Sequence, residues 1–269
     1  MRIGICTGVE HVAAAAEAGF VYVELTVGAV CPTEGEAAFQ AAAARLAALP
    51  LPAEAFNCFL PGTLHVTGSD VDLPAVGAYM ETALRRVAAV GGKIVVFGSG
   101  GARRAPDGFP LEQARAQFID AARLAGETAA RHGVTVVLEP LVARMCNIFN
   151  RVDEGAAYVR AVAHPHVRLL TDLYHFAEGG EPLAHLEQNA PLFAHVHLAT
   201  PSLPETASGT TYDFTGFLAA LRAGGYEGRI SVEDNPGLLG GKADLTPAFR
   251  AIYAYVEECL ASRGSYEGA

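Results

Sequence analysis

The chain has 269 residues, of which 51% are hydrophobic and 18% are charged, and its formal net charge is -10. A chain of this length and apolar content can bury one large core, and about 250 residues is a typical length for a closed α/β barrel. The negative charge argues against a nucleic-acid-binding surface, which needs clustered Lys and Arg to replace the counterions of the phosphate backbone.

Short β-branched runs alternate with longer segments of helical period along the whole chain. Eight runs are predicted to be strands: 2–6, 21–27, 53–59, 93–99, 134–140, 167–173, 193–199 and 229–234. Helices are predicted between them at 11–19, 36–49, 76–91, 111–133 and 214–225, and a last helix at 247–264 closes the chain. No linker-like tract interrupts this alternation. It predicts an α/β protein with a single (β/α)8 TIM barrel, one domain over residues 1–269.

The ends of the chain and its cysteines predict a cytoplasmic location. The first residues, MRIGIC, do not resemble a signal peptide, and no run approaches the roughly 20 apolar residues of a membrane span. The five cysteines are scattered and form no CxxC pair, which favours a reduced compartment and argues against a thiolate zinc site. We therefore expect a small-molecule partner, with no nucleic acid and no membrane.

Metal-competent side chains stand at the ends of the last four predicted strands, which carry Glu139, Asp172, His197 and Glu233 in that order. In a (β/α)8 barrel these ends meet at one rim, where the chemistry takes place. A single acid at a strand end is more often a helix cap or a salt-bridge partner, but four successive ends predict a metal site. Three carboxylates and one imidazole suit manganese, magnesium or cobalt, and zinc is also compatible.

The segment FAHVHLATPS places two histidines two residues apart in one strand, so both side chains point to the same face. His197 lies nearer the mouth of the barrel and is the expected ligand. His195 is expected to be hydrogen-bonded one layer deeper. Glu24, inside the second predicted strand, is expected to belong to the core network rather than to the ligand set.

Six motifs, FNCFLPG, VVFGSGGARR, VVLEPL, LLTDLYH, HVHLA and ISVED, resemble those of the xylose isomerase-like barrels, which include sugar phosphate isomerases/epimerases and ketose 3-epimerases. The resemblance covers nearly the whole chain. It implies that Glu139, Asp172, His197 and Glu233 bind one divalent metal ion. It also implies that Glu139 and Glu233 act as an acid/base pair at the carbon next to a carbonyl, and that His175 contacts the substrate.

The sequence departs from the ketose epimerase pattern, which has Asn-Arg after the strand-five glutamate where this chain has Val142 and Ala143 in EPLVARMCN, and it lacks two polar substrate contacts. Met145 stands where that family has a glutamate that contacts substrate, and Leu203 stands where it tends to have an arginine. These changes count against epimerisation of a free ketose and leave the metal ligands intact. In the loop GSGGARRAPDGF, Arg103 or Arg104 could bind a carboxylate or a phosphate, with a loop-locking salt bridge as the alternative.

Two further polar residues are candidates to line the pocket. Asn57 and His65 both belong to the segment FNCFLPGTLH, which follows the third predicted strand. Each could therefore reach the mouth of the barrel and contact a substrate. For His65, a position on the protein surface is an equally acceptable interpretation.

The predicted function is that of a metal-dependent isomerase or epimerase of carbohydrate metabolism, acting on a sugar, sugar acid or sugar phosphate. A lyase or dehydratase of a keto sugar or inosose shares the first proton abstraction and is the alternative. A barrel of the endonuclease IV type would need more histidine ligands and a basic groove, and neither is visible. A non-catalytic sugar-binding or structural subunit is the alternative of another class. The oligomeric state is open, a homo-oligomer included.

Overall fold

Eight parallel strands form a closed barrel in the order in which they occur in the chain. The structure is a computed structural model that describes residues 1–199, 212–233 and 245–262. The strands are β1 (Arg2–Cys6), β2 (Val23–Thr26), β3 (Ala53–Asn57), β4 (Ile94–Phe97), β5 (Thr135–Leu138), β6 (Val167–Asp172), β7 (Phe193–Ala199) and β8 (Arg229–Glu233). Strand β1 pairs with both β2 and β8, which closes the barrel. The predicted (β/α)8 fold is therefore confirmed.

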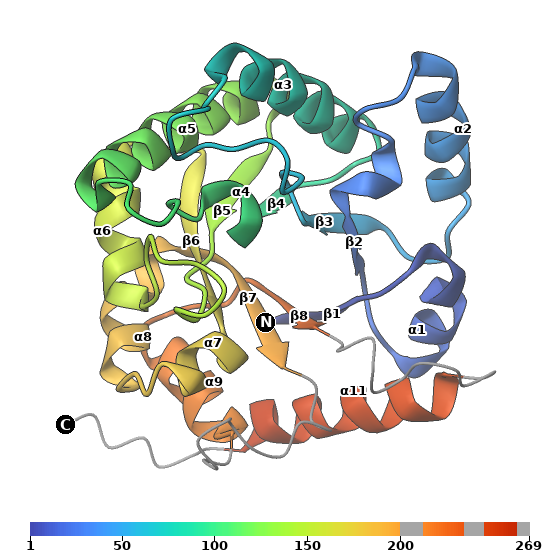
Figure 1. The fold of residues 1–269 in the computed structure, drawn as a ribbon. Coiled ribbons are helices and arrows are strands. Elements are labelled where there is room, and N and C mark those ends of the chain that lie inside the picture. The colour runs from blue at the N-terminus through green and yellow to red at the C-terminus, as the bar shows by residue number, and fades with distance from the viewer. Residues whose placement is uncertain (200–211, 234–244, 263–269) are drawn as a thin grey trace.

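Helices surround the barrel on its outside (Figure 1). Those predicted from the sequence are α1 (Val12–Ala18), α2 (Glu36–Ala47), α3 (Leu73–Ala89), α5 (Leu111–His132), α9 (Phe214–Ala223) and α11 (Thr246–Ala261). The structure adds α4 (Gly100–Arg103), α6 (Val152–Val162), α7 (Leu173–Glu178) and α8 (Ala184–Asn189), and the short 3-10 turns η1 (Val9–His11), η2 (Val27–Val30) and η3 (Ala190–Leu192). Gly19 and Gly133 end α1 and α5 in the left-handed conformation, as helix C-caps commonly do.

Several strands end earlier than predicted because the chain leaves the sheet to form the mouth of the barrel. Strand β4 stops at Phe97, and the next residues turn sharply through Ser99, whose φ of 35° lies in the left-handed region. Strand β5 stops at Leu138, so that Glu139 is the first residue of the following loop. The polar residues of the rim therefore belong to strand ends and to the first residues of loops.

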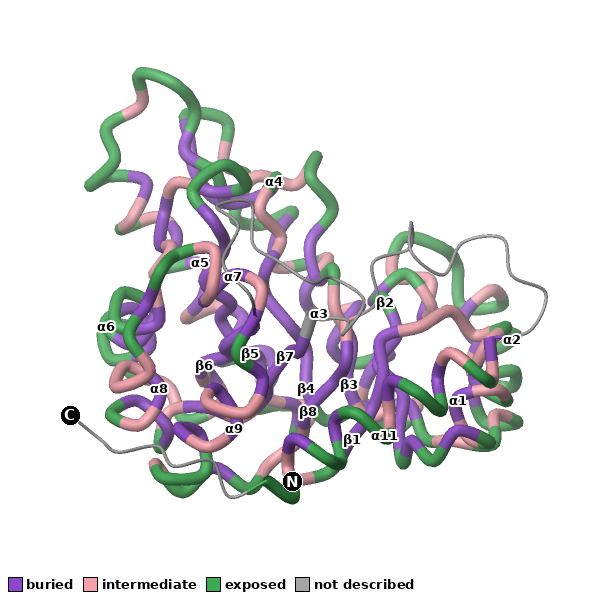
Figure 2. The backbone as a smooth tube through the Cα atoms, turned by 90° about the horizontal axis from the view of Figure 1, so that it is seen from below, coloured by how far each residue is buried: buried purple, intermediate pink, exposed green. Residues whose placement is uncertain are grey.

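The barrel separates two apolar clusters. The larger one lies between the outer faces of the strands and the helices. The smaller one is formed by Tyr22, Ala55, Ile94, Val96, Val137 and Leu170. Figure 2 shows that the strands are buried along most of their length. Close packing extends to helix α6, where a Cβ on Gly155 would come within 2.8 Å of the Leu169 side chain on β6. None of the described helices is both long and apolar enough to cross a bilayer.

Candidate metal centre

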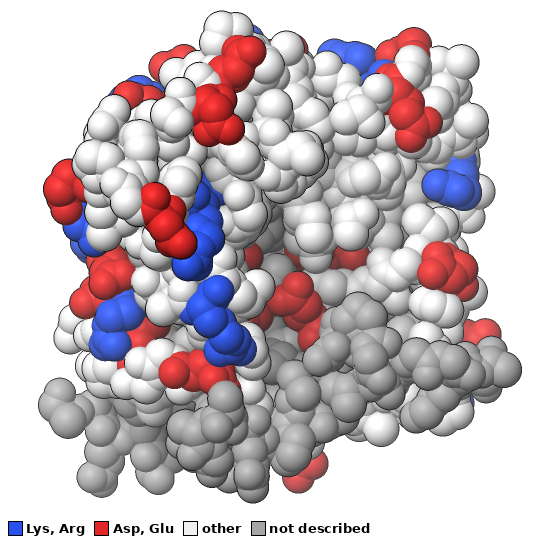
Figure 3. Space-filling model, in the orientation of Figure 1, with Lys and Arg blue, Asp and Glu red and all other residues white. Residues whose placement is uncertain are grey.

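Four metal-competent side chains meet at the carboxyl ends of strands β5 to β8. Glu139 directly follows β5, Asp172 and Glu233 are the last residues of β6 and β8, and His197 lies near the end of β7. One donor atom of each residue lies within 4.8 Å of the donor atoms of the other three. Figure 3 shows acidic side chains at the bottom of a hollow in this face of the molecule. The four residues predicted to be ligands are thus neighbours in the structure.

The imidazole of His197 lies among the three carboxylates. Its Nδ1 atom is 3.4 Å from Oε1 of Glu139 and 3.4 Å from Oε2 of Glu233, and the distance to Oδ2 of Asp172 is 4.0 Å. Nδ1 of His197 and Oδ2 of Asp172 are both buried without a hydrogen-bond partner. Because an unpaired buried polar atom costs about 1–3 kcal/mol, such atoms require an explanation. A divalent cation fits this donor set of three carboxylates and one imidazole.

The pKa values of the cluster reflect its surplus of negative charge. Burial, with the charges of Glu233 and Glu139 adding to it, raises the pKa of Asp172 to about 6. Burial alone would lower the pKa of His197, but Glu24 and Glu233 outweigh it and raise that pKa well above its usual value. Burial opposes ionisation of Glu139 too, yet contact with His197 holds the pKa of that carboxyl below normal. A proton on the His197 imidazole therefore balances part of the negative charge of the three carboxylates. A bound cation would balance this charge instead.

The two histidines of the HVH segment point into the barrel and contact one carboxylate, that of Glu24. Nε2 of His195 is 2.7 Å from one Glu24 oxygen, and Nε2 of His197 is 2.9 Å from the other. Ser231 Oγ lies 3.2 Å from Nε2 of His195, which places His195 in a hydrogen-bonded network inside the barrel, as expected. Only His197 presents its other ring nitrogen to the carboxylates at the mouth.

The neighbourhood of Glu139 fixes its position at the end of β5. A Cβ at Gly98, directly after β4, would collide with the Glu139 carboxylate, so a side chain at this position would displace that carboxylate. Nη2 of Arg103 donates to the backbone oxygen of Glu139 at 2.6 Å. The Arg103 side chain is fully buried, with its guanidinium 4.1 Å from the centre of the Phe149 ring. In this conformation Arg103 holds Glu139 and does not face the cavity, where a contact with substrate was expected.

A cavity of about 390 Å³ opens over the metal-competent residues. Its lining includes Glu139, His197 and Glu233, the polar residues Asn57, Ser99, Tyr174 and His175, and the apolar residues Leu60, Leu141 and Met145. No Lys or Arg is among the described residues that line it. Cys58 and Ser99, which also line it, have φ angles of 53° and 35°. Non-glycine residues in this strained region cluster at functional sites.

Two of the predicted substrate contacts, Asn57 and His175, line this cavity. Oδ1 of Asn57 is buried without a hydrogen-bond partner. Nδ1 of His175 accepts a hydrogen bond from the backbone N–H of Val142 at 3.3 Å. Because a neutral imidazole carries one proton, this assigns the proton to Nε2, the remaining nitrogen of the ring.

Three further residues singled out from the sequence differ in their positions. His65 is not among the cavity-lining residues, and its Nδ1 pairs with Asp70 at 2.9 Å on the exposed surface. Met145 lines the cavity and is 47% exposed, so an apolar side chain stands where the resemblance to the ketose epimerases implied a glutamate. Leu203 lies outside the described residues.

Tyr174 and Leu141 were not singled out from the sequence. The signal available was their position two residues after Asp172 and Glu139, respectively, in the motifs DLYH and EPL. Residues that follow a strand end in this way reach the mouth of a (β/α)8 barrel.

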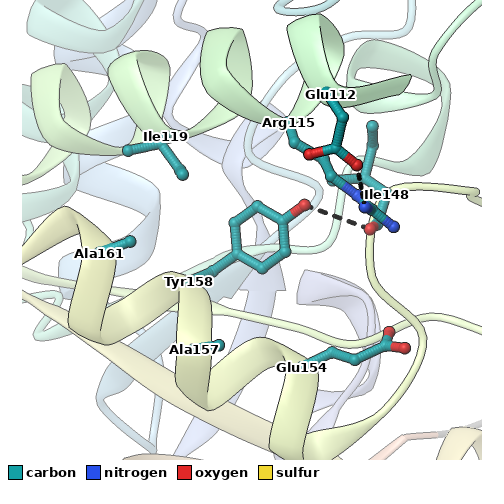
Figure 4. Close-up of a pocket in the computed structure, with 8 residues that line it drawn as sticks. All are labelled: Glu112, Arg115, Ile119, Ile148, Glu154, Ala157, Tyr158 and Ala161. Atoms are coloured by element: carbon teal, nitrogen blue, oxygen red, sulfur yellow. Dashed lines mark hydrogen bonds and ion pairs between the residues drawn. The ribbon is translucent and has the colours of Figure 1, made fainter. Parts of the chain in front are cut away.

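Other sites in the molecule are less suited to chemistry. Figure 4 shows a second cavity, between helices α5 and α6, with Tyr158 and Ile119 on its apolar floor and Glu112, Arg115 and Glu154 at its edge. Asp153, Glu181 and His185 also lie close enough to hold a cation. Glu181, however, accepts from the backbone N–H of Val152 and thereby caps helix α6. Neither group includes a residue of a strand end.

Comparison with known proteins gives concordant results. The xylose isomerase-like TIM barrel family model matches residues 12–251. The 3-dehydro-D-guloside 4-epimerase of Escherichia coli is 31% identical over 187 residues, which are 67% of this chain and 70% of the relative. The structure of D-psicose 3-epimerase with D-tagatose from Clostridium cellulolyticum has a TM-score of 0.81 at 15% identity and covers 97% of this chain and 99% of that one. A structure of the IOLI protein with a zinc atom has a TM-score of 0.73 at 17% identity, over 97% and 98% of the two chains. At these identities the solved structures are evidence of the fold alone.

Proposed function

The chain belongs to the xylose isomerase-like TIM barrel family, and from this membership we propose that it is a divalent-metal-dependent epimerase of a keto sugar. The metal is held by Glu139, Asp172, His197 and Glu233. The observation that supports this most strongly is the convergence of these four side chains, with donor atoms within 4.8 Å of one another. The E. coli relative adds support, since its name describes inversion of a carbon beside a keto group.

The residues at the mouth fit a hard divalent ion such as manganese, magnesium or cobalt, and zinc is compatible. Such an ion, when bound, stabilises the negative charge that develops on a carbonyl oxygen as the neighbouring carbon loses its proton. The structure of the IOLI protein was solved with a zinc atom, which is in line with a metal in this fold. Burial of Asp172 and His197 keeps water away from their donor atoms.

Glu139 and Glu233 form the acid/base pair. Each places a carboxylate oxygen 3.4 Å from Nδ1 of His197, and they come from strands that are separated in the barrel by β6 and β7. One carboxylate takes the proton from the carbon next to the carbonyl, and the electron pair of that C–H bond passes toward the carbonyl oxygen. The other glutamate enters this step as its carboxylic acid and gives its proton to the opposite face of the carbon, as the electron pair returns from the oxygen to form the new C–H bond. The result is the epimer, with no net gain or loss of atoms.

The substrate is uncharged. Glu139 and Glu233 line the cavity, Asp172 lies beside them, and no described Lys or Arg lines it, so a divalent cation still leaves the mouth negative and a phosphate or carboxylate group is repelled. Outside the described residues, the stretches 200–211 and 234–244 contain Lys242 and no Arg. The hydroxyl groups of a neutral sugar can instead pair with Nε2–H of His175 and with the Asn57 amide.

A keto sugar in ring form, such as a 3-dehydro-glycoside, suits the cavity better than a free ketose. Met145 and Leu141 give the lining apolar surface where the ketose epimerases have a further carboxylate. A pyranose ring presents apolar C–H faces that pack on such surface. The 31% identical relative also acts, according to its name, on a 3-dehydro-guloside.

The test measures proton transfer. The enzyme is given Mn²⁺ and a 3-dehydro-D-guloside in D₂O, and NMR follows both epimer formation and deuterium at the inverted carbon. Glu139→Gln and Glu233→Gln keep an oxygen for the metal but remove the basic charge, so each should lower the rate about 10²- to 10⁴-fold at saturating metal. Glu54→Gln, at the other end of the barrel, is the matched control and should turn over normally.

Three outcomes would contradict the proposal. Deuterium exchange that persists in both Gln variants with metal bound would assign the proton to another group. A product lighter by one water would identify a lyase. D-Psicose 1-phosphate or another phosphorylated ketose turned over faster than its neutral counterpart would overturn the assignment of an uncharged substrate.

A further inference from the structure

A chain of buried polar groups runs through the inside of the barrel below the metal-competent residues. The hydroxyls of Tyr22 and Ser231 are 3.0 Å apart, and Ser231 continues to His195 at 3.2 Å. His195 and His197 then share Glu24, one on each carboxylate oxygen. All five residues are at most 1% exposed. This hydrogen-bonded series of side chains therefore ends, nearest the mouth of the barrel, at His197, a residue of the proposed metal centre.

Burial of the Glu24 carboxylate inside the barrel is energetically unfavourable. A carboxylate that is fully removed from water is strongly disfavoured unless it is paired and hydrogen-bonded. Here its two oxygens accept from two imidazoles, and an apolar side chain of similar volume would fill the same space without needing either partner. Packing alone therefore does not account for a carboxylate on β2.

The contact with Glu24 decides which nitrogen of His197 is available at the mouth. A carboxylate only accepts hydrogen bonds, so Nε2 of His197 must carry a proton. Nδ1, on the other side of the ring, faces Glu139, Glu233 and Asp172 and has no hydrogen-bond partner. Loss of the Nε2 contact would free the ring to turn and to carry its proton on either nitrogen.

We propose that Glu24 is a positioning residue that holds Nε2–H of His197 and so presents Nδ1 as the ligand to the divalent metal. The proposal rests on the metal centre described under the proposed function. A carboxylate behind a ligating imidazole fixes its orientation and raises its basicity, and removal of such a partner typically lowers metal affinity about 10- to 100-fold. Glu24 is not among the residues that line the cavity, and its role in the proposal is carried by its contact with His197.

Calorimetric titration of the metal-free protein with MnCl₂ tests this without any substrate. Glu24→Gln is expected to weaken Mn²⁺ binding about 10- to 100-fold, since an amide has one oxygen and cannot accept from both imidazoles. His195→Gln is the matched control, because its side-chain amide can still donate to Glu24 and leave the contact with His197 intact. It should change the affinity much less.

A second measurement uses the unmodified sequence and so does not depend on a variant that folds. In the Zn²⁺-loaded, ¹⁵N-histidine-labelled protein, long-range ¹H–¹⁵N spectra should identify His197 as protonated on Nε2 and coordinated through Nδ1. Coordination through Nε2, or an unchanged Mn²⁺ affinity in Glu24→Gln, would overturn the inference. If the wild-type protein binds no metal at all, the proposed function itself fails, and the two failures are thereby distinguished.

Discussion

The two ends of the barrel hold their carboxylates in opposite ways. At the amino ends of the strands, Glu54 accepts from Arg2 and from Arg229, each at 2.6 Å. At the carboxyl ends, Glu139 and Asp172 share the imidazole of His197, and no Lys or Arg of the described residues is ion-paired with either. The pKa of Glu54 is accordingly lowered by its two arginines, which outweigh its partial burial, whereas burial raises the pKa of Asp172.

This difference separates the part of the barrel that stabilises the fold from the part that does chemistry. The ion pairs of Glu54 with Arg2 and Arg229 at the lower end stabilise the fold whether or not a metal is bound. At the upper end the buried carboxylate of Asp172, whose pKa is raised, costs stability until a cation is bound, and such a cost is typical of functional sites. Substitutions at the two ends should therefore affect stability in opposite directions.

The largest expected effect concerns the two histidines, which lie at different depths of the barrel. His197→Ala removes a proposed ligand and should weaken Mn²⁺ binding more than about 100-fold, beyond the range typical of a residue that only supports a ligand. His195→Ala removes a partner of Glu24 and should have a smaller effect. Calorimetric titration measures both. Equal losses of affinity in the two variants would contradict the assignment of His197 alone as ligand.

Arg103 fixes the position of Glu139 at the mouth of the barrel, because its guanidinium donates a hydrogen bond to the backbone oxygen of Glu139. Arg103→Met should lower kcat about 10- to 100-fold with little change in KM, since a displaced base no longer meets the reacting carbon. Arg103→Lys, which keeps a donor and a charge, should recover part of the loss. The exposed neighbour provides the control, Arg104→Met. A rise in KM without a fall in kcat would instead indicate that Arg103 contacts the substrate.

Removal of a charge at the mouth should stabilise the metal-free protein. Asp172→Asn retains the oxygen that caps α7 and removes a carboxylate whose pKa is raised to about 6 by burial. In wild type this ionisation costs stability progressively between about pH 4 and 6 and fully above that range. Thermal unfolding in EDTA at pH 7.5 should therefore give the variant an advantage of about 1–2 kcal/mol, which disappears below pH 4. A less stable variant at pH 7.5 would contradict the comparison.

The smallest effect is expected at the lower end. Glu54→Gln weakens the contacts with Arg2 and Arg229 and should destabilise the protein by about 1 kcal/mol at pH 7. Since the pKa of Glu54 is lowered in the folded state, its stabilisation is present above the unfolded pKa. It is lost as the pH falls through the folded pKa. Urea unfolding at pH 7 and pH 3 measures both; a difference that persists at pH 3 would exclude the ion pairs as its cause.

The metal-competent residues were predictable because the ends of strands can be located from the local sequence pattern. Alternation of apolar residues marks the strands, and all parallel strands of a closed barrel point their carboxyl ends to one rim. Asp172, His197 and Glu233 therefore needed no knowledge of the loops. The same reasoning placed His195 deeper than His197 and Glu24 in the core network, and the contacts of all three agree with it.

The residues that come from loops were not predictable in this way. Arg103 is the last residue of the single helical turn α4, which follows Ser99 in the left-handed conformation, and its guanidinium lies on the Phe149 ring. His65 pairs with Asp70, five residues ahead, at the surface. Both conformations depend on long-range packing and on φ angles that the residue types alone do not reveal. Asn57, the last residue of β3, was predictable for the same reason as the proposed ligands.

The most direct test of the metal centre is anomalous diffraction from crystals of the wild-type protein grown with Mn²⁺. The account predicts one manganese peak per chain at the carboxyl ends of β5 to β8, surrounded by Glu139, Asp172, His197 and Glu233, with Nδ1 of His197 facing the peak. No peak at this position, or a peak held by other residues such as Asp153, Glu181 and His185, would contradict it.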